Sequence, residues 1–130
     1  MDVKVYSKTK NGAEKVSNNF RVREFACSDG TDPIFIAPAL VNVLQALRDH
    51  FGAAITICSG YRTVAKNKAV GGAQYSQHLY GAAADITVKG VRAEKVACEA
   101  RKLLGNTGGV GRYKTFTHVD VRAQRADWAG

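Results

Sequence analysis

The most constraining feature of the sequence is an apolar stripe with helical spacing in its first half. The stripe repeats at i, i+3, i+4, i+7 and i+11 and consists of Leu40, Val43, Leu44, Leu47 and Phe51. Pro38 suits the first position of a helix, and Gly52 suits its end. The pattern therefore predicts an amphipathic helix over residues 38–51, which must bury its stripe against another layer.

Short strand-forming segments follow this helix. Strands are expected at residues 54–58, 82–88, 108–113 and 116–122, the last two joined by a turn at 114–115. A second helix is expected over residues 91–104, with Gly105 in the place of a C-cap glycine. These elements predict an α+β fold in which two main helices pack on a small, mainly antiparallel sheet.

The length of 130 residues suits one domain, residues 1–130. Residues 1–19 are polar, and the alternation around Val3 and Val5 suits either an edge strand or a loosely held arm. Loops are expected at residues 28–33 and 63–77. No apolar run approaches the ~18 residues of a membrane-spanning helix, and the first ten residues lack the apolar core of a secretory signal.

The net charge of +8 predicts attraction to polyanions without identifying one. Nucleic acid, anionic lipid and the bacterial wall all qualify. No run of like charges, aromatic-rich basic platform or helix-turn-helix pattern accompanies the charge, so we expect no nucleic-acid partner. The three cysteines, Cys27, Cys58 and Cys98, lack metal-binding spacing and are expected to be free thiols, with Cys58 and Cys98 packing as small apolar residues.

Two histidines have different expected roles. His50 ends the first helix, where a partial positive charge is favourable, and is expected to be structural or solvated. His78 precedes a predicted strand in which Asp85 is the one acid among small and apolar residues. Burying such an acid is costly unless it is paired or binds a cation. Taken alone, the segment also suits an Asp85 paired with a basic residue and a His78 that is merely a loop residue.

The third histidine favours a metal site. Strict alternation over residues 116–122 places His118, Asp120 and Arg122 on one strand face and apolar residues on the other. His78, Asp85 and His118 would then supply two nitrogens and one oxygen. A catalytic zinc typically has three such ligands and an open fourth position.

Five short motifs in order resemble one family over about residues 20–128. Ser76-x-His78-x6-Asp85 followed by His118-x-Asp120 is similar to the zinc D-alanyl-D-alanine carboxypeptidase family of peptidoglycan peptidases, which belongs with lysostaphin-type peptidases and the Hedgehog domain. The remaining motifs are Ser59-Gly60-Tyr61-Arg62-Thr63, Val70-Gly71-Gly72-Ala73 and Gly109-Val110-Gly111-Arg112-Tyr113.

The resemblance implies one zinc per chain, held by His78, Asp85 and His118. It implies that Arg62 binds the substrate's carboxylate or peptide carbonyl and that Ser76 supports the substrate site. Arg62 is also expected to be catalytic, by stabilising negative charge that develops on the substrate oxygen. The expected activity is hydrolysis of D,D or L,D bonds in peptidoglycan stem peptides or cross-links, by a carboxypeptidase or endopeptidase. Peptidoglycan peptides are the expected partners of a monomeric enzyme.

The general base departs from the family pattern. Many relatives carry an acid three residues before the last ligand or a histidine two before it, where this chain has Thr115 and Phe116. Asp120 is the nearest substitute, and we take it as the base. The alternative is that Asp120 orients a ligand imidazole.

One alternative function comes from a different class of protein. A catalytically silent, zinc-containing wall-binding or phage structural module would also suit the missing acid at position 115.

The small size, basic charge and lack of a signal favour a phage-type lysin, an endolysin made in the cytoplasm that reaches the wall by release or an unknown export route.

Overall fold

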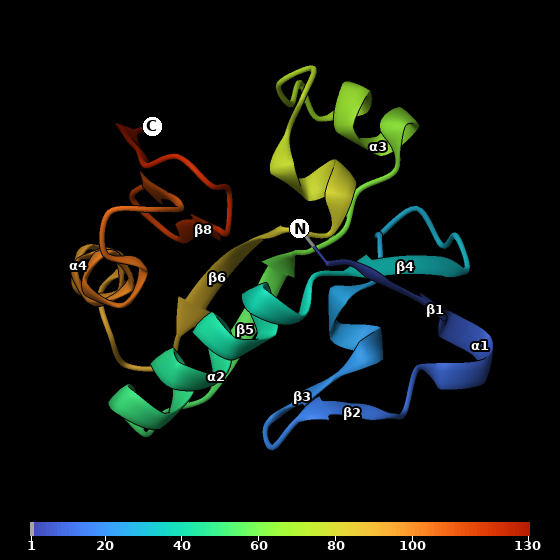
Figure 1. The fold of residues 1–130 in the computed structure, drawn as a ribbon, viewed down its shortest axis with the longest axis horizontal. Helices are drawn as coiled ribbons and strands as arrows, with labels where there is room; N and C mark the ends of the chain where they lie inside the picture. The colour runs from blue at the N-terminus through green and yellow to red at the C-terminus, as the bar shows by residue number, and fades with distance from the viewer. Residues whose placement is uncertain (1) are drawn as a thin grey trace.

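The computed structural model describes residues 2–130. The helices, including two 3-10 turns, are α1 Lys8–Asn11, η1 Val22–Phe25, α2 Pro38–Phe51, α3 Val64–Ala69, η2 Gln77–Tyr80 and α4 Ala93–Leu104. The strands are β1 Lys4–Ser7, β2 Lys15–Ser17, β3 Phe20–Arg21, β4 Pro33–Ile36, β5 Ile55–Ser59, β6 Ala83–Val88, β7 Gly109–Arg112, β8 Thr117–Asp120 and β9 Ala126–Ala129. Figure 1 shows the helix α2 in front of β5 and β6, with the helix α4 seen end-on to one side.

The largest sheet has five strands in the order β5-β6-β8-β7-β9. Neighbouring strands are antiparallel except for β7 and β9, which are parallel. The mainly antiparallel sheet is therefore confirmed. β8 lies between β6 and β7, so strands distant in the sequence become neighbours.

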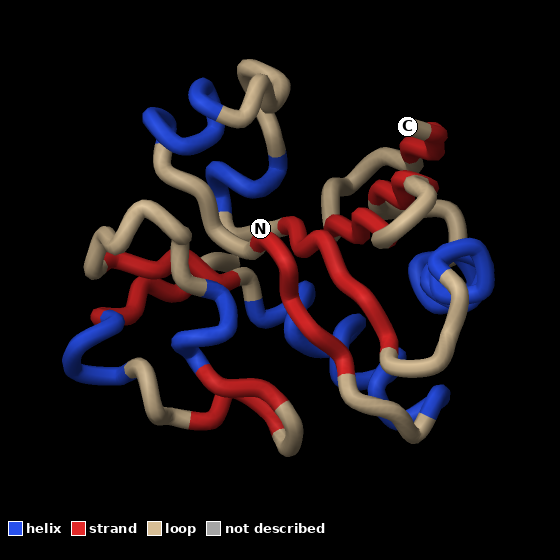
Figure 2. The backbone as a smooth tube through the Cα atoms, turned by 180° about the vertical axis from the view of Figure 1, so that it is seen from behind, coloured by secondary structure: helices blue, strands red, loops and turns tan. Residues whose placement is uncertain are grey.

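One face of this sheet packs against α2 and α4, and Figure 2 shows strands β5 and β6 in front of α2. The alternation of β6 and β8 turns Ala84, Ile86 and Val119 toward the helices, where all three are buried. The core they form also contains Leu40, Leu44, Leu47, Val96, Ala97 and Ala100. The opposite face is left for polar side chains, and the α+β class with two main helices is confirmed.

The N-terminal segment forms its own small sheets. β1 pairs with β4, so the strand alternative for these residues is the observed one, and β2 pairs with β3. Asp32 links β1 to the chain before β4, because its carboxylate accepts hydrogen bonds from Ser7 Oγ at 2.7 Å and Thr9 N at 2.9 Å.

Several short elements were not predicted, namely α1, β2, β3, η1, β4, α3, η2 and β9. α3 lies within the expected loop 63–77, and Thr63 begins it by accepting a hydrogen bond from Lys66 N. β4 and β9, with the sequences Pro-Ile-Phe-Ile and Ala-Asp-Trp-Ala, lack the strict alternation of apolar and polar residues that indicates a strand. β9 exists because β7 offers it a partner, a condition that local sequence does not contain.

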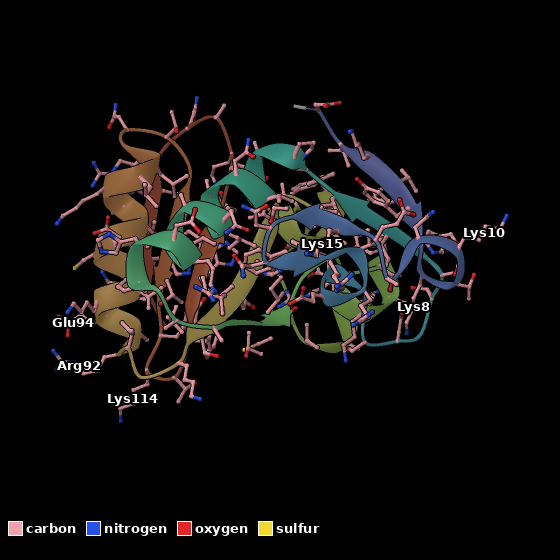
Figure 3. All side chains as sticks on the ribbon, turned by 90° about the horizontal axis from the view of Figure 1, so that it is seen from below. Lys8, Lys10, Lys15, Arg92, Glu94 and Lys114 are labelled. Atoms are coloured by element: carbon pink, nitrogen blue, oxygen red, sulfur yellow. The ribbon has the colours of Figure 1, made fainter. Side chains whose placement is uncertain are left out.

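The labelled basic residues are spread over the molecule. Figure 3 shows Lys8 and Lys10 at one end, Lys15 near the middle, and Arg92 and Lys114 at the other end. This arrangement agrees with the absence of a basic cluster in the sequence. None of the helices within residues 2–130 has the length and hydropathy needed to span a membrane.

All three cysteines are free, as expected. Cys27 is buried, but Cys58 and Cys98 are exposed, so the expected packing of these two as small apolar residues is wrong. The apolar neighbours of Cys58 in the sequence alternate across strand β5, which turns the thiol outward.

Candidate metal centre

A single row of residues crosses all five strands of the large sheet. The register pairs Ser59 with Asp85, Asp85 with His118, His118 with Gly111 and Gly111 with Trp128. Because paired residues of neighbouring strands point to the same side, the row lies on the face away from α2 and α4. The sheet thereby brings together side chains from positions 59 to 128.

The centre of this row joins the three expected metal ligands. His118 Nδ1 lies 2.9 Å and His78 Nε2 3.3 Å from Asp85 Oδ1. The candidate ligand atoms of the three residues lie within 4.8 Å of one another, and all three residues are buried. Expected ligands separated by 40 positions in the chain thus form one compact group.

The backbone fixes the orientation of His78. Its Nδ1 lies 2.7 Å from the carbonyl oxygen of Gly60. A carbonyl can only accept, so His78 Nδ1 donates this hydrogen bond, and Nε2 is the ring nitrogen that faces Asp85. Ser76 supports the same turn, because its Oγ accepts a hydrogen bond from His78 N at 3.3 Å.

His118 is held between two carboxylates. Its Nδ1 faces Asp85, and its Nε2 lies 2.8 Å from Asp120 Oδ2. Burial alone would lower the pKa of His118, but the hydrogen bonds to Asp120 and Asp85 outweigh burial and raise it. An imidazole whose second nitrogen donates to a carboxylate is the arrangement that commonly orients a zinc-binding histidine.

Asp120 is enclosed rather than open to the substrate side. Its residue surface is 0% exposed. Its Oδ1 accepts hydrogen bonds from Gly109 N at 2.9 Å and Arg122 Nε at 2.9 Å, and its Oδ2 accepts one from Arg122 Nη2 at 2.7 Å. Burial alone would raise the pKa of Asp120, but bonds from His118 and Arg122 outweigh it and hold the pKa well below its usual range. These contacts favour the orienting role over the role of base.

Gly109 makes room for this carboxylate. A Cβ at position 109 would stand 2.2 Å from Asp120 Oδ2. Gly111 lies two residues further along β7 on the same face of the sheet. It leaves the space that the Trp128 ring occupies, since a Cβ at position 111 would stand 2.7 Å from the ring. The Gly-x-Gly of β7 is therefore a packing requirement of the site.

Arg62 lies beside Asp85 at the end of the row. Its guanidinium donates to Ser59 Oγ at 3.1 Å, Asn67 Oδ1 at 3.4 Å and Asp85 Oδ2 at 3.3 Å. A guanidinium has more N–H donors than these three contacts use, which leaves donors for a substrate oxygen. Burial alone would raise the pKa of Asp85, but bonds from His118 and His78 outweigh it and hold the pKa well below its usual range.

Asn67 on α3 was missed by the sequence reasoning. It is 4% exposed, accepts from Arg62, and its Nδ2 donates to Ala73 O at 2.8 Å. A Cβ at Gly72 would stand 2.1 Å from Asn67 Oδ1, so the glycine pair of the Val70–Ala73 motif closes over this amide. Asn67 is the fourth residue of α3, and its only signal in the sequence was its place between two recognised motifs.

A cleft of about 340 Å³ opens over the metal group. Arg62, Ser76, His78, Asp85 and His118 all line it, so the structure brings these expected site residues together. Its other wall contains Tyr113, Phe116, Arg122 and Trp128. Tyr113 ends a recognised motif and Arg122 shares the strand face of His118, whereas Trp128 carried no signal in the sequence. The indole of Trp128 lies over His118, with ring centroids 4.9 Å apart.

The remaining histidine lies elsewhere. His50 is half-exposed and approaches Glu99 at 3.5 Å, in agreement with a structural or solvated role. Asp120 and Arg122 lie behind His118 and are not among the candidate metal ligands.

The residues of the group fit zinc. Two imidazoles and a carboxylate are typical ligands of a catalytic zinc, and the cleft leaves one side of the group accessible. The hydrogen bonds that His78 donates to Gly60 O and that His118 donates to Asp120 fix both imidazoles, which is the support that such ligands require. The group accordingly accounts for one zinc ion per chain.

Comparison with known proteins agrees with this geometry. The family model described as Peptidase M15 matches residues 14–120. A zinc D-Ala-D-Ala carboxypeptidase of Streptomyces albus G is 49% identical over 53 residues, which are 38% of this chain and 21% of that protein. The chain thus matches about a fifth of the length of this curated relative. The extent of the family match, together with the His-Asp-His group, shows that the chain belongs to the peptidase M15 family.

Proposed function

We propose that this chain hydrolyses peptide bonds of bacterial peptidoglycan, either in stem peptides or in cross-links. The observation that carries the proposal is the His78–Asp85–His118 group at the base of a cleft, with Arg62 bonded to Asp85 beside it. Membership of the M15 family supports a metallopeptidase, and the name of the Streptomyces relative supports a D-amino-acid-containing substrate. We also propose that the fold is similar to that of the Hedgehog domain.

His78, Asp85 and His118 would hold zinc through Nε2, a carboxylate oxygen and Nδ1, respectively. A zinc ion there would supply Lewis acidity, for polarising a carbonyl and for lowering the pKa of a water molecule toward neutral pH. Asp120 would keep the His118 ring in place, because its carboxylate accepts from Nε2.

Arg62 would position the substrate. Its contacts with Ser59, Asn67 and Asp85 fix the guanidinium while leaving N–H donors for a carboxylate or peptide carbonyl. Ser76 would keep the histidine turn and the cleft wall in place. In the reaction the C–N bond breaks, the oxygen of water joins the acyl carbon, and a proton ends on the leaving amine.

The charge of +8 supports attraction of the protein to an anionic wall. We propose a single-domain monomer that acts as a phage-type lysin, is made in the cytoplasm and reaches the wall by release or export. Peptidoglycan peptides would be its partners.

A silent zinc module remains a second candidate because of one observation. Asp85 is the only carboxylate among the described residues that line the cleft, and Asp120 is enclosed. A wall-binding protein without turnover would need no further proton acceptor in the cleft.

Mass spectrometry of muropeptides separates the two candidates. Zinc-loaded protein is incubated with a muropeptide ending in D-Ala-D-Ala and with a cross-linked muropeptide, alongside chelator-treated protein and His118→Ala. The expected products have masses that add up to the substrate plus one water, and they identify the bond cut. No cleavage by fully loaded wild type would favour the binding module.

A further inference from the structure

The Tyr113 hydroxyl is a cleft group that the mechanism above does not use. Tyr113 follows β7 and lines the cleft. In the sheet order, β6 and β8 carry Asp85 and His118, while β5 and β7 flank them. Arg62, which follows β5, and Tyr113, which follows β7, therefore lie on opposite sides of the metal group.

Three contacts fix the Tyr113 ring. It stacks on Phe116 with centroids 4.4 Å apart and an interplanar angle of 10°. On another side, the ring fills the space in which a Cβ at Gly130 would stand, 2.1 Å from a ring carbon. The Nε1–H of Trp128 donates to the phenolic oxygen at 2.9 Å.

The Trp128 bond decides what the hydroxyl can do. An indole N–H only donates, so Tyr113 is the acceptor in this bond and keeps its own proton for another partner. No acceptor among residues 2–130 takes that proton, and the cleft lies beside it. Tyr113 thus brings a free hydrogen-bond donor to the substrate side of the cleft.

Two other donors beside the cleft are engaged within the protein, whereas Arg62 keeps N–H groups for the substrate. His78 Nδ1 donates to Gly60, and the Arg122 guanidinium donates to Asp120. A donor held rigidly in advance stabilises developing charge without reorganisation, and the three contacts of Tyr113 meet that condition. A merely structural tyrosine would need no free hydroxyl in the cleft.

We propose that Tyr113 is a further catalytic residue, whose O–H donates a hydrogen bond to the oxygen of the scissile carbonyl as that oxygen becomes negative. This inference rests on the proposed peptidase function. Arg62 and Tyr113 would then bind the substrate from opposite sides of the metal group. Arg62 would bind it already in the ground state, and the Tyr113 hydrogen bond would be strongest in the transition state.

Tyr113→Phe tests the proposal, because it keeps the stacked ring and removes only the hydroxyl. Loss of one such donor is expected to lower kcat by roughly 10²- to 10³-fold with little change in KM. Zinc content, measured by elemental analysis, and the thermal midpoint should stay at the wild-type values. Tyr6→Phe, which removes a hydroxyl on β1 outside the cleft, is the matched control.

A binding measurement supplies a readout that is independent of turnover. A D-Ala-D-Ala analogue with a phosphinate in place of the scissile amide presents a tetrahedral anion. Calorimetry should show that Tyr113→Phe weakens this analogue about as much as it lowers kcat/KM, while binding of free D-Ala-D-Ala to chelator-treated protein stays unchanged.

Trp128→Phe removes the indole N–H that orients the Tyr113 hydroxyl and leaves the hydroxyl itself in place. It should lower kcat less than Tyr113→Phe does, and the double variant should be no slower than Tyr113→Phe alone, since both act through one hydroxyl. Full activity in Tyr113→Phe, or a loss explained by lower zinc content, would overturn the role of Tyr113. Inactive wild type would instead overturn the proposed peptidase function itself.

Discussion

Gly111 and Trp128 face each other across the parallel β7–β9 pair, and the indole occupies the space that any side chain at position 111 would need. The missing side chain lets the indole reach both His118 and Tyr113. The metal centre therefore depends on a strand, β9, that no sequence pattern revealed.

Replacing this glycine is the first test of that dependence. Gly111→Ala should lower the free energy of unfolding by about 1–3 kcal/mol, because the new Cβ overlaps the indole. Denaturant unfolding measures the change. In a Trp128→Ala background, Gly111→Ala should lower the free energy of unfolding by less. An equal loss in both backgrounds would mean that the new Cβ does not clash with the indole.

Trp128 should report metal binding by its fluorescence. It is the one tryptophan of the chain, and its ring centroid lies 4.9 Å from that of His118. A zinc ion bound to His118 would therefore change the electrostatic environment of the indole. Titrating chelator-treated protein with zinc should change the emission until one equivalent is bound. Mg²⁺, which prefers oxygen ligands, and the variant His78→Ala are the controls, and a zinc response that survives His78→Ala would argue against the site.

The two roles considered for Asp120 are separated by Asp120→Asn. If Asp120 orients His118, zinc affinity should fall roughly 10- to 100-fold, and saturating zinc should restore most of the hydrolysis. We expect this result because the carboxylate is enclosed and accepts from His118, Arg122 and Gly109. Full zinc content with hydrolysis reduced about 10²- to 10⁴-fold would instead identify Asp120 as the base.

Asn67→Leu tests whether α3 holds Arg62 in place. The change preserves volume and removes both the acceptor for Arg62 and the donor to Ala73 O, at a cost of about 1–3 kcal/mol in stability. Poorer positioning of the guanidinium should raise KM more than it lowers kcat. In an Arg62→Ala background that effect on KM should disappear, whereas a general loss of structure would persist in both.

Asp32 should make the N-terminal segment sensitive to acid. The Ser7 hydroxyl and the Thr9 amide bond its carboxylate and lower its pKa below the ordinary value of 3.8. A lowered folded pKa contributes stability above the unfolded pKa, and this stability is lost as the pH falls through the folded pKa. The difference in thermal midpoint between wild type and Asp32→Asn should therefore be largest near neutral pH and shrink below about pH 4. A difference that does not vary with pH would contradict this account.

Much of the fold follows from periodicity in the sequence. The helical stripe of residues 38–51 and the alternation around His118 are local patterns, because helix and strand geometry directly decide which side chains share a face. For the same reason, the local sequence placed His118 and Asp120 on one side of the sheet. The order of the motifs then indicated that His78 and Asp85 would join them.

The roles around the metal group were decided only by the tertiary structure. Insertion of β8 between β6 and β7 sets Gly109 against Asp120 and encloses that carboxylate, while the β7–β9 pair brings Trp128 over His118. Such contacts depend on which distant strands become neighbours and in what register, and a period of two along one strand does not carry that information. The sequence by itself therefore determined which residues can bind a metal, and the packing of β7, β8 and β9 determined how each of them is oriented.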